Sequence, residues 1–311
     1  MTIGKKVFES SQEWIYRNAR PVDLARWQYH FENGTAENVL KTLSYYQNED
    51  GGFGHALEAD SWNPQSSPIQ TWAAMEILRE IGFADDQHDM IKGILRYLEN
   101  GKDFACEVWQ NSIPSNNDYP HAFWWDWSEN ATHYNPTAYL CGFIIKYTDK
   151  GSALHDKGIS IAKKAVSHFM NSSEINEIGD GHLNLCYLRL RQFCEELNES
   201  NIFDMRLLND KLSNNIKPFM NNLQLDNFCD GVILEIIKAY RDELCLITDN
   251  KNVVETICTH LYESQRDDGT WDIPWNWNEY PDQWSISKNW WKAYGIIVNL
   301  LFLKQFGHLL R

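Results

Sequence analysis

Several features that would place a protein in a familiar class are missing from this sequence. The 311 residues include 28 lysines and arginines against 43 aspartates and glutamates, and no Lys/Arg-rich run interrupts the formal net charge of −15. Nucleic acid is bound largely through clustered positive charge. A nucleic acid is therefore not an expected partner.

Cysteine pairs and long apolar runs are also missing. The seven cysteines form no C-x-x-C pair, and their odd number and mostly apolar neighbours indicate reduced, buried thiols. The N-terminal residues hold no hydrophobic signal core, and the longest apolar tract, AYGIIVNLLFL, is too short to span a bilayer. We expect a cytoplasmic protein with no integral membrane segment.

Sustained two-residue alternation, the mark of a β-strand, is missing as well, whereas helical periodicity recurs along the chain. This periodicity predicts about twelve helices. They are expected near residues 5–18, 21–31, 36–47, 66–81, 86–99, 135–148, 152–171, 182–198, 203–219, 230–247, 251–264 and 285–306. The fold class is therefore predicted to be all-α.

The expected helices are of two kinds. Those near 66–81, 135–148 and 285–306 are apolar around most of their circumference, whereas those near 86–99 and 251–264 carry one apolar stripe. The first kind is expected inside and the second outside, in pairs that recur every roughly 40–50 residues, as in a repeat array. Six pairs closed into a ring would cover both faces of the inner layer, and residues 1–311 would form a single domain.

Two inner helices carry start signals in the sequence. Ser66 and Ser67 stand before Pro68, and Asn135 is expected to cap a helix whose first residue is Pro136.

One turn motif occurs twice in the sequence, in YQNEDGGFGHALEADSW (46–62) and in SQRDDGTWDIPWNW (264–277). Glycine permits a sharp turn, the aromatic side chain can anchor the loop between helices, and glutamine can bond backbone groups left unpaired at helix ends. The shared frame Gln-x-x-x-Gly-x-aromatic consists of Gln47, Gly51 and Phe53 and of Gln265, Gly269 and Trp271. Both copies follow an expected outer helix and precede an inner one, which indicates a structural element of a repeat fold.

At these residues the chain resembles the superfamily of terpenoid cyclases and protein prenyltransferase β subunits. The stretch SYYQNEDGGFGHALEADSWNPQSSPIQTWAAMEIL is similar in layout to the β-subunit repeat, in which Gly-Gly-Phe-Gly precedes an inner helix that starts around Thr-Tyr-Ala-Ala. The segment QRDDGTW looks like the QW motif of squalene-type cyclases. The resemblance implies an α6–α6 toroid and an enzyme that acts on an isoprenoid in an aromatic-lined central cavity.

The metal and acid motifs of that superfamily are not reproduced. Its zinc ligands are an Asp-x-Cys pair and a later His, and the nearest set here, Asp226, Cys229 and His260, has the wrong spacing. The Asp-x-Asp-Asp acid motif of class II cyclases is absent. DDQHD at 85–89 matches a magnesium motif, but it lies where an outer helix is expected to begin, so N-capping explains it. We predict no metal and no cofactor.

Acidic and aromatic residues gather in three loops, 54–62, 119–133 and 271–288, that each precede an expected inner helix. We expect these loops at one rim of the ring, where helix N-termini favour anions. The candidate catalytic residues are Glu58, Asp60, Asp126 and His121. The candidate ligand-binding residues are Trp62, Trp124, Trp125, Trp275, Trp277, Tyr280 and Trp284.

Aromatic walls suit two classes of small-molecule substrate. Isoprenoids need apolar surface and π faces that stabilise carbocations, whereas sugars stack on tryptophan while carboxylates bind their hydroxyl groups. A carbohydrate-active toroid enzyme, a glycosidase or lyase, therefore stays open beside the isoprenoid enzyme. So does a non-catalytic toroid that acts as an interaction module, in which the tryptophans only plug the ring and Glu58 and Asp60 are solvated loop acids.

Overall fold

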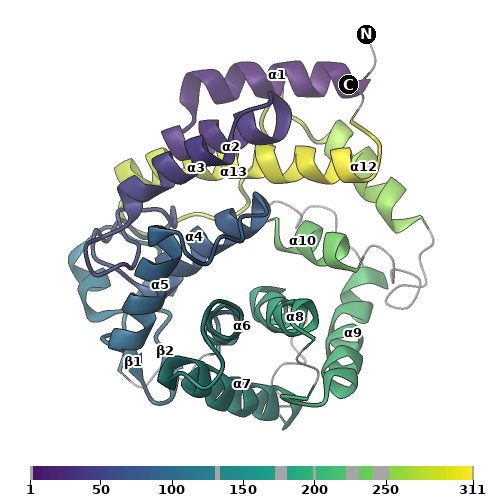
Figure 1. Cartoon of the computed structure of the whole chain (residues 1–311). Coiled ribbons are helices and arrows are strands. Elements are labelled where there is room, and N and C mark those ends of the chain that lie inside the picture. Colours follow the sequence, from purple (N-terminus) through teal and green to yellow (C-terminus); the bar gives the residue numbers. More distant parts are fainter. Residues whose placement is uncertain are drawn as a thin grey trace. The chain divides into compact units, whose positions relative to one another are not determined.

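The structure is a computed structural model that describes residues 3–129, 134–171, 181–198, 201–221, 231–240 and 252–309. These residues hold twelve α-helices and one two-stranded hairpin of two residues per strand (Figure 1). The described part of the chain is therefore all-α, as predicted. None of its helices is long and apolar enough to cross a membrane.

The chain divides into two compact units. Unit 1 comprises Met1–Leu43 and Lys217–Arg311, and unit 2 comprises Ser44–Ile216. The expectation of one domain over the whole chain stays a prediction.

Unit 2 contains alternating helices of unequal burial. Its helices are α4 (Pro68–Glu80), α5 (Asp89–Asn100), α6 (Thr137–Tyr147), α7 (Ala153–Asn171), α8 (Gly181–Glu196) and most of α9 (Met205–Asn221). The 3-10 turn Ser44–Tyr46 precedes α4. The hairpin of β1 (Phe104–Ala105) and β2 (Val108–Trp109) and the 3-10 turns Pro114–Asp118 and Phe123–Trp125 lie between α5 and α6. Every residue of α6 from Thr137 to Ile145 is buried, whereas the buried residues of α5 form one stripe. The helices of unit 2 thus differ in burial.

Helix α6 packs closely against α7 and α8 (Figure 1). A Cβ atom on Gly142 of α6 would lie 2.5 Å from the Phe193 ring of α8, and one on Gly158 of α7 would lie 2.7 Å from the Ile144 side chain. Glycine at both positions therefore sets how near the neighbouring helices approach α6.

The two predicted helix starts had different outcomes. Ser67 is the N-cap of α4, where its hydroxyl accepts a hydrogen bond from the Gln70 amide at 3.3 Å and Pro68 occupies the first helical position, as predicted. The predicted cap of α6 was wrong, because Pro136 itself is the N-cap and no side chain caps the helix. The Asn135 side chain instead accepts a hydrogen bond from the Cys186 thiol at 3.4 Å.

Unit 1 is built around its long C-terminal helix. Its helices are α1 (Ile3–Asn18), α2 (Pro21–Phe31), α3 (Ala36–Leu43), α10 (Val232–Ala239), α12 (Val253–Glu263) and α13 (Pro281–Gln305). Helix α13 contacts α1, α2 and α10. It begins at Pro281, four residues before the predicted start, because proline at the first position and Asp282 in the first turn both favour a helix N-terminus.

The repeated turn folds in the same way in both copies. Gln47 Nε2 donates to the Gly51 carbonyl at 2.9 Å and to the Met90 carbonyl of α5 at 3.1 Å. Gln265 Nε2 donates to the Gly269 carbonyl at 3.2 Å and to the Val7 carbonyl of α1 at 3.0 Å. Met90 and Val7 are not at helix C-termini, so the expectation that these glutamines bond unpaired groups at helix ends was wrong.

Both glycines of the repeated turn form the sharp turn that was predicted, and their backbone is left-handed, with φ of +94° at Gly51 and +87° at Gly269. Each lies against a neighbouring helix, since an added Cβ would be 2.1 Å from the Gly93 carbonyl oxygen and 2.3 Å from the Ser10 carbonyl oxygen, respectively. The aromatic residues that follow, Phe53 and Trp271, are buried. The turn therefore docks a loop onto a helix in each unit.

The cysteines follow the prediction in part. Cys141, Cys186, Cys194 and Cys258 are buried free thiols, and burial raises the pKa of Cys258 to about 12. Cys106 is exposed at the tip of the hairpin, where a buried thiol had been expected.

Candidate functional site

Two of the three candidate loops lie side by side in unit 2. Ser61 and His121 form an antiparallel bridge. On either side of it, the Ala122 amide donates to the Asp60 carbonyl at 2.9 Å and the Trp62 amide donates to the Pro120 carbonyl at 2.9 Å. The structure thus places the segment with Glu58, Asp60 and Trp62 next to the segment with His121 and Asp126, before the N-termini of α4 and α6.

The two acids of the first loop are buried. Glu58 is 6% exposed and Asp60 is 3% exposed, and a Glu58 carboxylate oxygen accepts a hydrogen bond from the Asp60 amide at 2.9 Å. The alternative that they are solvated loop acids is therefore wrong. The carboxylate of Glu58 serves the loop itself, because it satisfies a buried backbone donor.

His121 connects the interior of these loops to the surface. Its Nδ1 lies 2.6 Å from the Tyr119 carbonyl oxygen and its Nε2 lies 2.8 Å from Asp126 Oδ1. The His121 side chain is 6% exposed, whereas that of Asp126 is 67% exposed. A neutral imidazole has one N–H, so only the protonated ring can donate to both oxygens at once. The ring of His121 therefore links a backbone carbonyl of its own loop to an exposed carboxylate.

A buried amide network fixes the base of the His121 loop. Asn63 Nδ2 donates to Asn116 Oδ1 at 2.8 Å, and Asn116 Nδ2 donates to the Trp125 carbonyl at 3.1 Å. The Ser112 hydroxyl donates to the same carbonyl at 2.7 Å. Because the network ties both loops together through buried groups, the pair of loops has one defined conformation.

The tryptophans of these loops are only partly covered. Trp62, Trp124 and Trp125 are half-buried, and the Phe123 ring beside Trp124 is 54% exposed. The indole nitrogen of Trp125 is buried and has no hydrogen-bond partner among the described residues. Residues 130–133, the end of the predicted 119–133 loop, lie outside the described residues.

The third candidate loop belongs to unit 1, so its position beside the other two stays a prediction. Trp277 and Trp284 are buried with ring centroids 5.7 Å apart, and half-buried Trp275 lies edge-on to Trp291 at 5.2 Å. The loop ends at Tyr280, the N-cap of α13, so Trp284 is a helix residue and its assignment to the loop was wrong. The three candidate tryptophans pack within their own unit.

The candidate metal motifs have other roles or lie elsewhere. In DDQHD, Asp85 accepts a hydrogen bond from the Gln87 amide at 3.0 Å, and the N-cap of α5 is His88 rather than an aspartate. Asp226 and Cys229 lie outside the described residues. Within the described ranges, no group of three or more His, Cys, Asp or Glu side chains could hold a metal ion.

A pocket of about 230 Å³ lies in unit 2 between α4, α6 and α8. The C-terminal parts of α4 and α8, residues along the length of α6 and the segment that follows α4 surround it. Its lining is Met75, Leu78, Arg79, Gly82, Phe83, Ala84, Tyr139, Phe143, Lys146, Tyr147, Phe193 and Glu196. Apolar and aromatic side chains therefore form the wall, and three charged groups stand among them.

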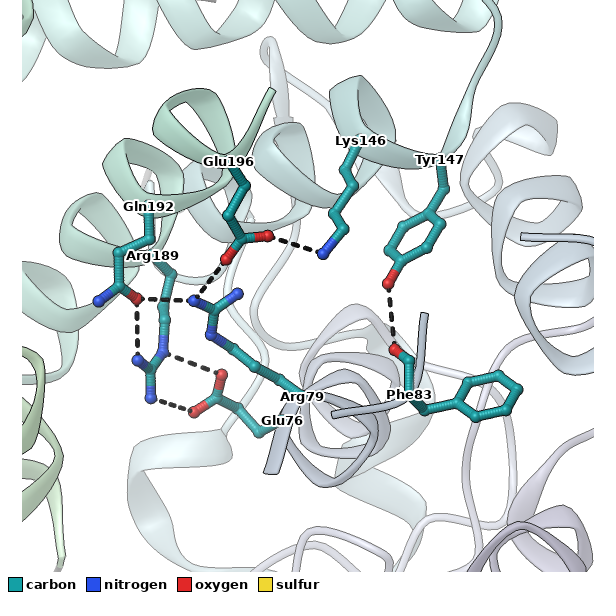
Figure 2. Close-up of polar contacts among 8 residues, drawn as sticks. All are labelled: Glu76, Arg79, Phe83, Lys146, Tyr147, Arg189, Gln192 and Glu196. Carbon is teal, nitrogen blue, oxygen red and sulfur yellow. Dashed lines mark hydrogen bonds and ion pairs between the residues drawn. The ribbon is translucent and has the colours of Figure 1, made fainter. Parts of the chain in front are cut away.

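The three charged groups come from three helices and meet at one carboxylate, as Figure 2 shows. Glu196 Oε1 lies 3.0 Å from Arg79 Nη2, and Glu196 Oε2 lies 2.7 Å from Lys146 Nζ. Arg79 also donates to the Gln192 side chain at 3.0 Å. Each carboxylate oxygen of Glu196 thus binds a different cation.

Aromatic rings surround the two cations. The Arg79 guanidinium lies 4.9 Å from the Phe193 ring centroid, and Lys146 Nζ lies 5.3 Å from that of Tyr147 and 5.5 Å from that of Phe193. Cations over ring faces are attracted by the ring quadrupole. The Tyr147 hydroxyl donates to the Phe83 carbonyl at 3.3 Å, which ties α6 to the segment after α4 (Figure 2).

Two titrating groups of the pocket have pKa values shifted in opposite directions. Burial raises the pKa of Glu196, but the hydrogen bond from Lys146 and the charge of Arg79 outweigh it and hold that pKa below its ordinary value. Burial, with the Glu76 charge as a smaller cause, raises the pKa of Tyr139 well above its ordinary value. Glu196 is therefore ionised and Tyr139 neutral at pH 7.

Sequence reasoning missed this pocket. The one available signal is a charged residue in the last turn of each mostly apolar inner helix, as in EILREIG (76–82) and IIKY (144–147). Such residues are common at helix ends because cations there stabilise the helix dipole. The signal becomes specific only when the fold brings the three ends together.

No family model, no curated protein and no solved structure matches this chain.

Proposed function

We propose that this protein is an enzyme of the terpenoid cyclase or prenyltransferase type that acts on an isoprenoid. The observation that carries the proposal is a set of aromatic rings shared by the inner helices of unit 2. Trp72 of α4 meets Tyr139 of α6 edge-on at 6.4 Å, and Tyr139 meets Phe193 of α8 edge-on at 5.4 Å. Apolar walls with ring faces and edges suit a hydrocarbon that carries positive charge during reaction.

The proposed fold is the closed α6–α6 toroid. Its support is the alternation of buried and striped helices in unit 2 and the repeated turn, which docks onto an outer helix in one copy and onto α1 in the other. Repeat arrays bury a continuous core by stacking such pairs.

We assign the proton chemistry to the paired loops before α4 and α6. When His121 carries a proton on Nε2, exposed Asp126, whose Oδ1 lies 2.8 Å away, accepts it in a hydrogen bond. When Asp126 rotates into solvent, Nε2–H is released for donation to a bound ligand, and His121 acts as a general acid. Buried Glu58 and Asp60 are assigned to the same site.

The burial of these acids is what favours an isoprenoid over a sugar. A carbohydrate-active enzyme presents two carboxyl groups on either side of an accessible glycosidic bond. Glu58 and Asp60 are 6% and 3% exposed and lie in one loop, which does not offer that arrangement.

The test is incubation of the full chain with prenyl diphosphates, linear terpenes, squalene and oligosaccharides, followed by thermal shift and mass-spectrometric product analysis. An isoprenoid that raises the melting temperature by mass action and is converted is the expected result. Asp126→Asn and His121→Gln should lose conversion, whereas Asp118→Asn, which changes an exposed carboxylate nearby, should not. Conversion of an oligosaccharide alone, or of no compound, would overturn the proposal.

A further inference from the structure

The charged side of the pocket, formed by Arg79, Lys146 and Glu196 in the last turns of α4, α6 and α8, is remote from the paired loops. Helix α4 has 13 residues and α6 has 11, so at 1.5 Å per residue the two ends of each lie about 15–20 Å apart. A ligand carboxylate held by Arg79 and Lys146 therefore binds away from the paired loops, although the rings of Tyr139 and Phe193 belong both to this pocket and to the aromatic set of the proposed isoprenoid enzyme.

Glu196 occupies this pocket as a ligand's carboxylate would. One oxygen accepts from Arg79 at 3.0 Å and the other from Lys146 at 2.7 Å. The carboxylate is at the pocket's charged side, next to the rings of Phe193 and Tyr147. The groups that bind it are thus arranged for a planar anion with two oxygens.

The position of Glu196 also allows its side chain to leave the pocket. It is the last residue of α8, where the helix dipole disfavours a negative charge, and its side chain is 40% exposed. A rotation of this side chain into solvent requires no movement of the backbone. By contrast, Arg79 and Lys146 are each 22% exposed and are positioned over aromatic rings. They stay in place when Glu196 moves.

We propose that the pocket binds a compact organic carboxylate with an aromatic or branched apolar body, and that Glu196 is a built-in competitor which the ligand displaces. The ligand carboxylate takes over the contacts to Arg79 and Lys146, and its body fills the space among Met75, Leu78 and Phe143. The positive charges of Arg79 and Lys146 then offset the negative charges of the ligand carboxylate and of the displaced Glu196 side chain.

The size and charge of the pocket decide the ligand class. Pockets for drug-sized ligands measure about 300–1,000 Å³, so a cavity of about 230 Å³ suits a smaller body than a long chain. The C-termini of three helices add partial negative charge around the cations, which disfavours a phosphate dianion. A monoanion is therefore the better match.

The test measures binding of phenylacetate to the full chain by titration calorimetry and thermal shift. Three comparison probes each lack one feature of phenylacetate. Phenethyl alcohol lacks the charge, acetate lacks the apolar body, and inorganic phosphate lacks the carboxylate shape. Phenylacetate should bind most tightly. Equal binding of phenethyl alcohol would show that the cations have no role, and equal binding of phosphate would show a general anion site; either overturns the proposal.

Two lysine variants separate the site from general effects. Lys146→Met should weaken phenylacetate binding at least about tenfold, the effect of one lost charged contact. Lys157→Met is the matched control, because Lys157 also lies over aromatic rings of unit 2, at 3.9 Å from the Phe104 centroid, but does not line the pocket. The same affinity in both variants would contradict the assignment.

Glu196→Gln tests the competitor directly. If Glu196 fills the site about nine-tenths of the time, removal of its charge tightens apparent binding about tenfold. Unchanged or weaker binding would overturn its role. Ala84→Phe is an independent check that does not rely on Glu196→Gln. Ala84 is exposed at the pocket, so a larger side chain there should block phenylacetate binding while the three charged groups remain.

Discussion

The two ends of α4 and α6 are built on different principles. At the N-terminal end, the preceding loops are joined by backbone pairing and by buried amides such as Asn63 and Asn116. At the C-terminal end, half-exposed ion pairs surround a pocket. A substitution at the first end leaves buried polar groups without a hydrogen-bond partner, because water cannot reach them. At the second end, water can solvate the charged groups that lose a partner. The first end therefore carries stability, and the second is free to exchange partners.

The largest difference in unfolding free energy between the two ends is expected from glycine substitutions. Gly51 and Gly82 both have positive φ, at +94° and +66°, but a Cβ on Gly51 would lie 2.1 Å from a backbone oxygen, whereas one on Gly82 meets nothing within 4 Å. Gly51→Ala should lower the free energy of unfolding by ~4 kcal/mol or prevent folding, and Gly82→Ala by ~1–2 kcal/mol, the cost of the left-handed backbone. Urea denaturation measures both.

A matching substitution in unit 1 sharpens the comparison. Gly269→Ala should cost as much as Gly51→Ala, because its Cβ would lie 2.3 Å from the Ser10 carbonyl oxygen. Similar losses at Gly51 and Gly82 would refute the view that close docking, rather than backbone conformation, fixes the repeated turn.

A smaller effect is expected from the amide network. Asn63 is fully buried, donates to Ser115 and Asn116 at 2.8 Å each, and accepts from the Gln65 amide at 3.0 Å. Asn63→Ala leaves these partners unsatisfied and should cost ~2–3 kcal/mol of unfolding free energy. Asn117→Ala is the control: it removes one hydrogen bond that the Trp127 amide donates to an exposed side chain, and it should cost under ~1 kcal/mol. Equal losses in chemical denaturation would mean that the loops are not held by their buried amides.

The same contrast explains what the sequence could predict. Helix positions and the repeated turn follow from local patterns, namely apolar periodicity, the Ser67–Pro68 start and the Gln-x-x-x-Gly-x-aromatic frame, so the all-α class and the turn were predicted. The backbone bridge between Ser61 and His121 and the meeting of Arg79, Lys146 and Glu196 depend on how distant segments pack. No local pattern records such a meeting, which is why the pocket was missed.

A still smaller effect is expected at the pocket itself. The Lys146–Glu196 pair has side chains 22% and 40% exposed, so water screens it. A double-mutant cycle with Lys146→Met and Glu196→Gln should give a coupling free energy of ~0.2–1 kcal/mol. A coupling above ~2 kcal/mol would make the pair a structural clamp of the kind found at the other end, and Glu196 would then be too firmly held to exchange with a ligand.

The smallest effect is a pH dependence of the same pair. Arg79 and Lys146 hold the pKa of Glu196 below its ordinary value of 4.5, against the opposing effect of burial. A carboxylate whose folded pKa is depressed adds stability that is fully present above its unfolded pKa and is lost as the pH falls through its folded pKa. The difference in unfolding free energy between the wild-type protein and Glu196→Gln should therefore be constant from about pH 7 to 5 and shrink below about pH 4.5. Denaturation at a series of pH values measures it, with Glu195→Gln, next to it on α8 and with a 53% exposed side chain, as the control. A difference that persists unchanged at pH 3 would mean that the charge of Glu196 does not hold the two cations, and the ion pairs at this end would lose their assigned role.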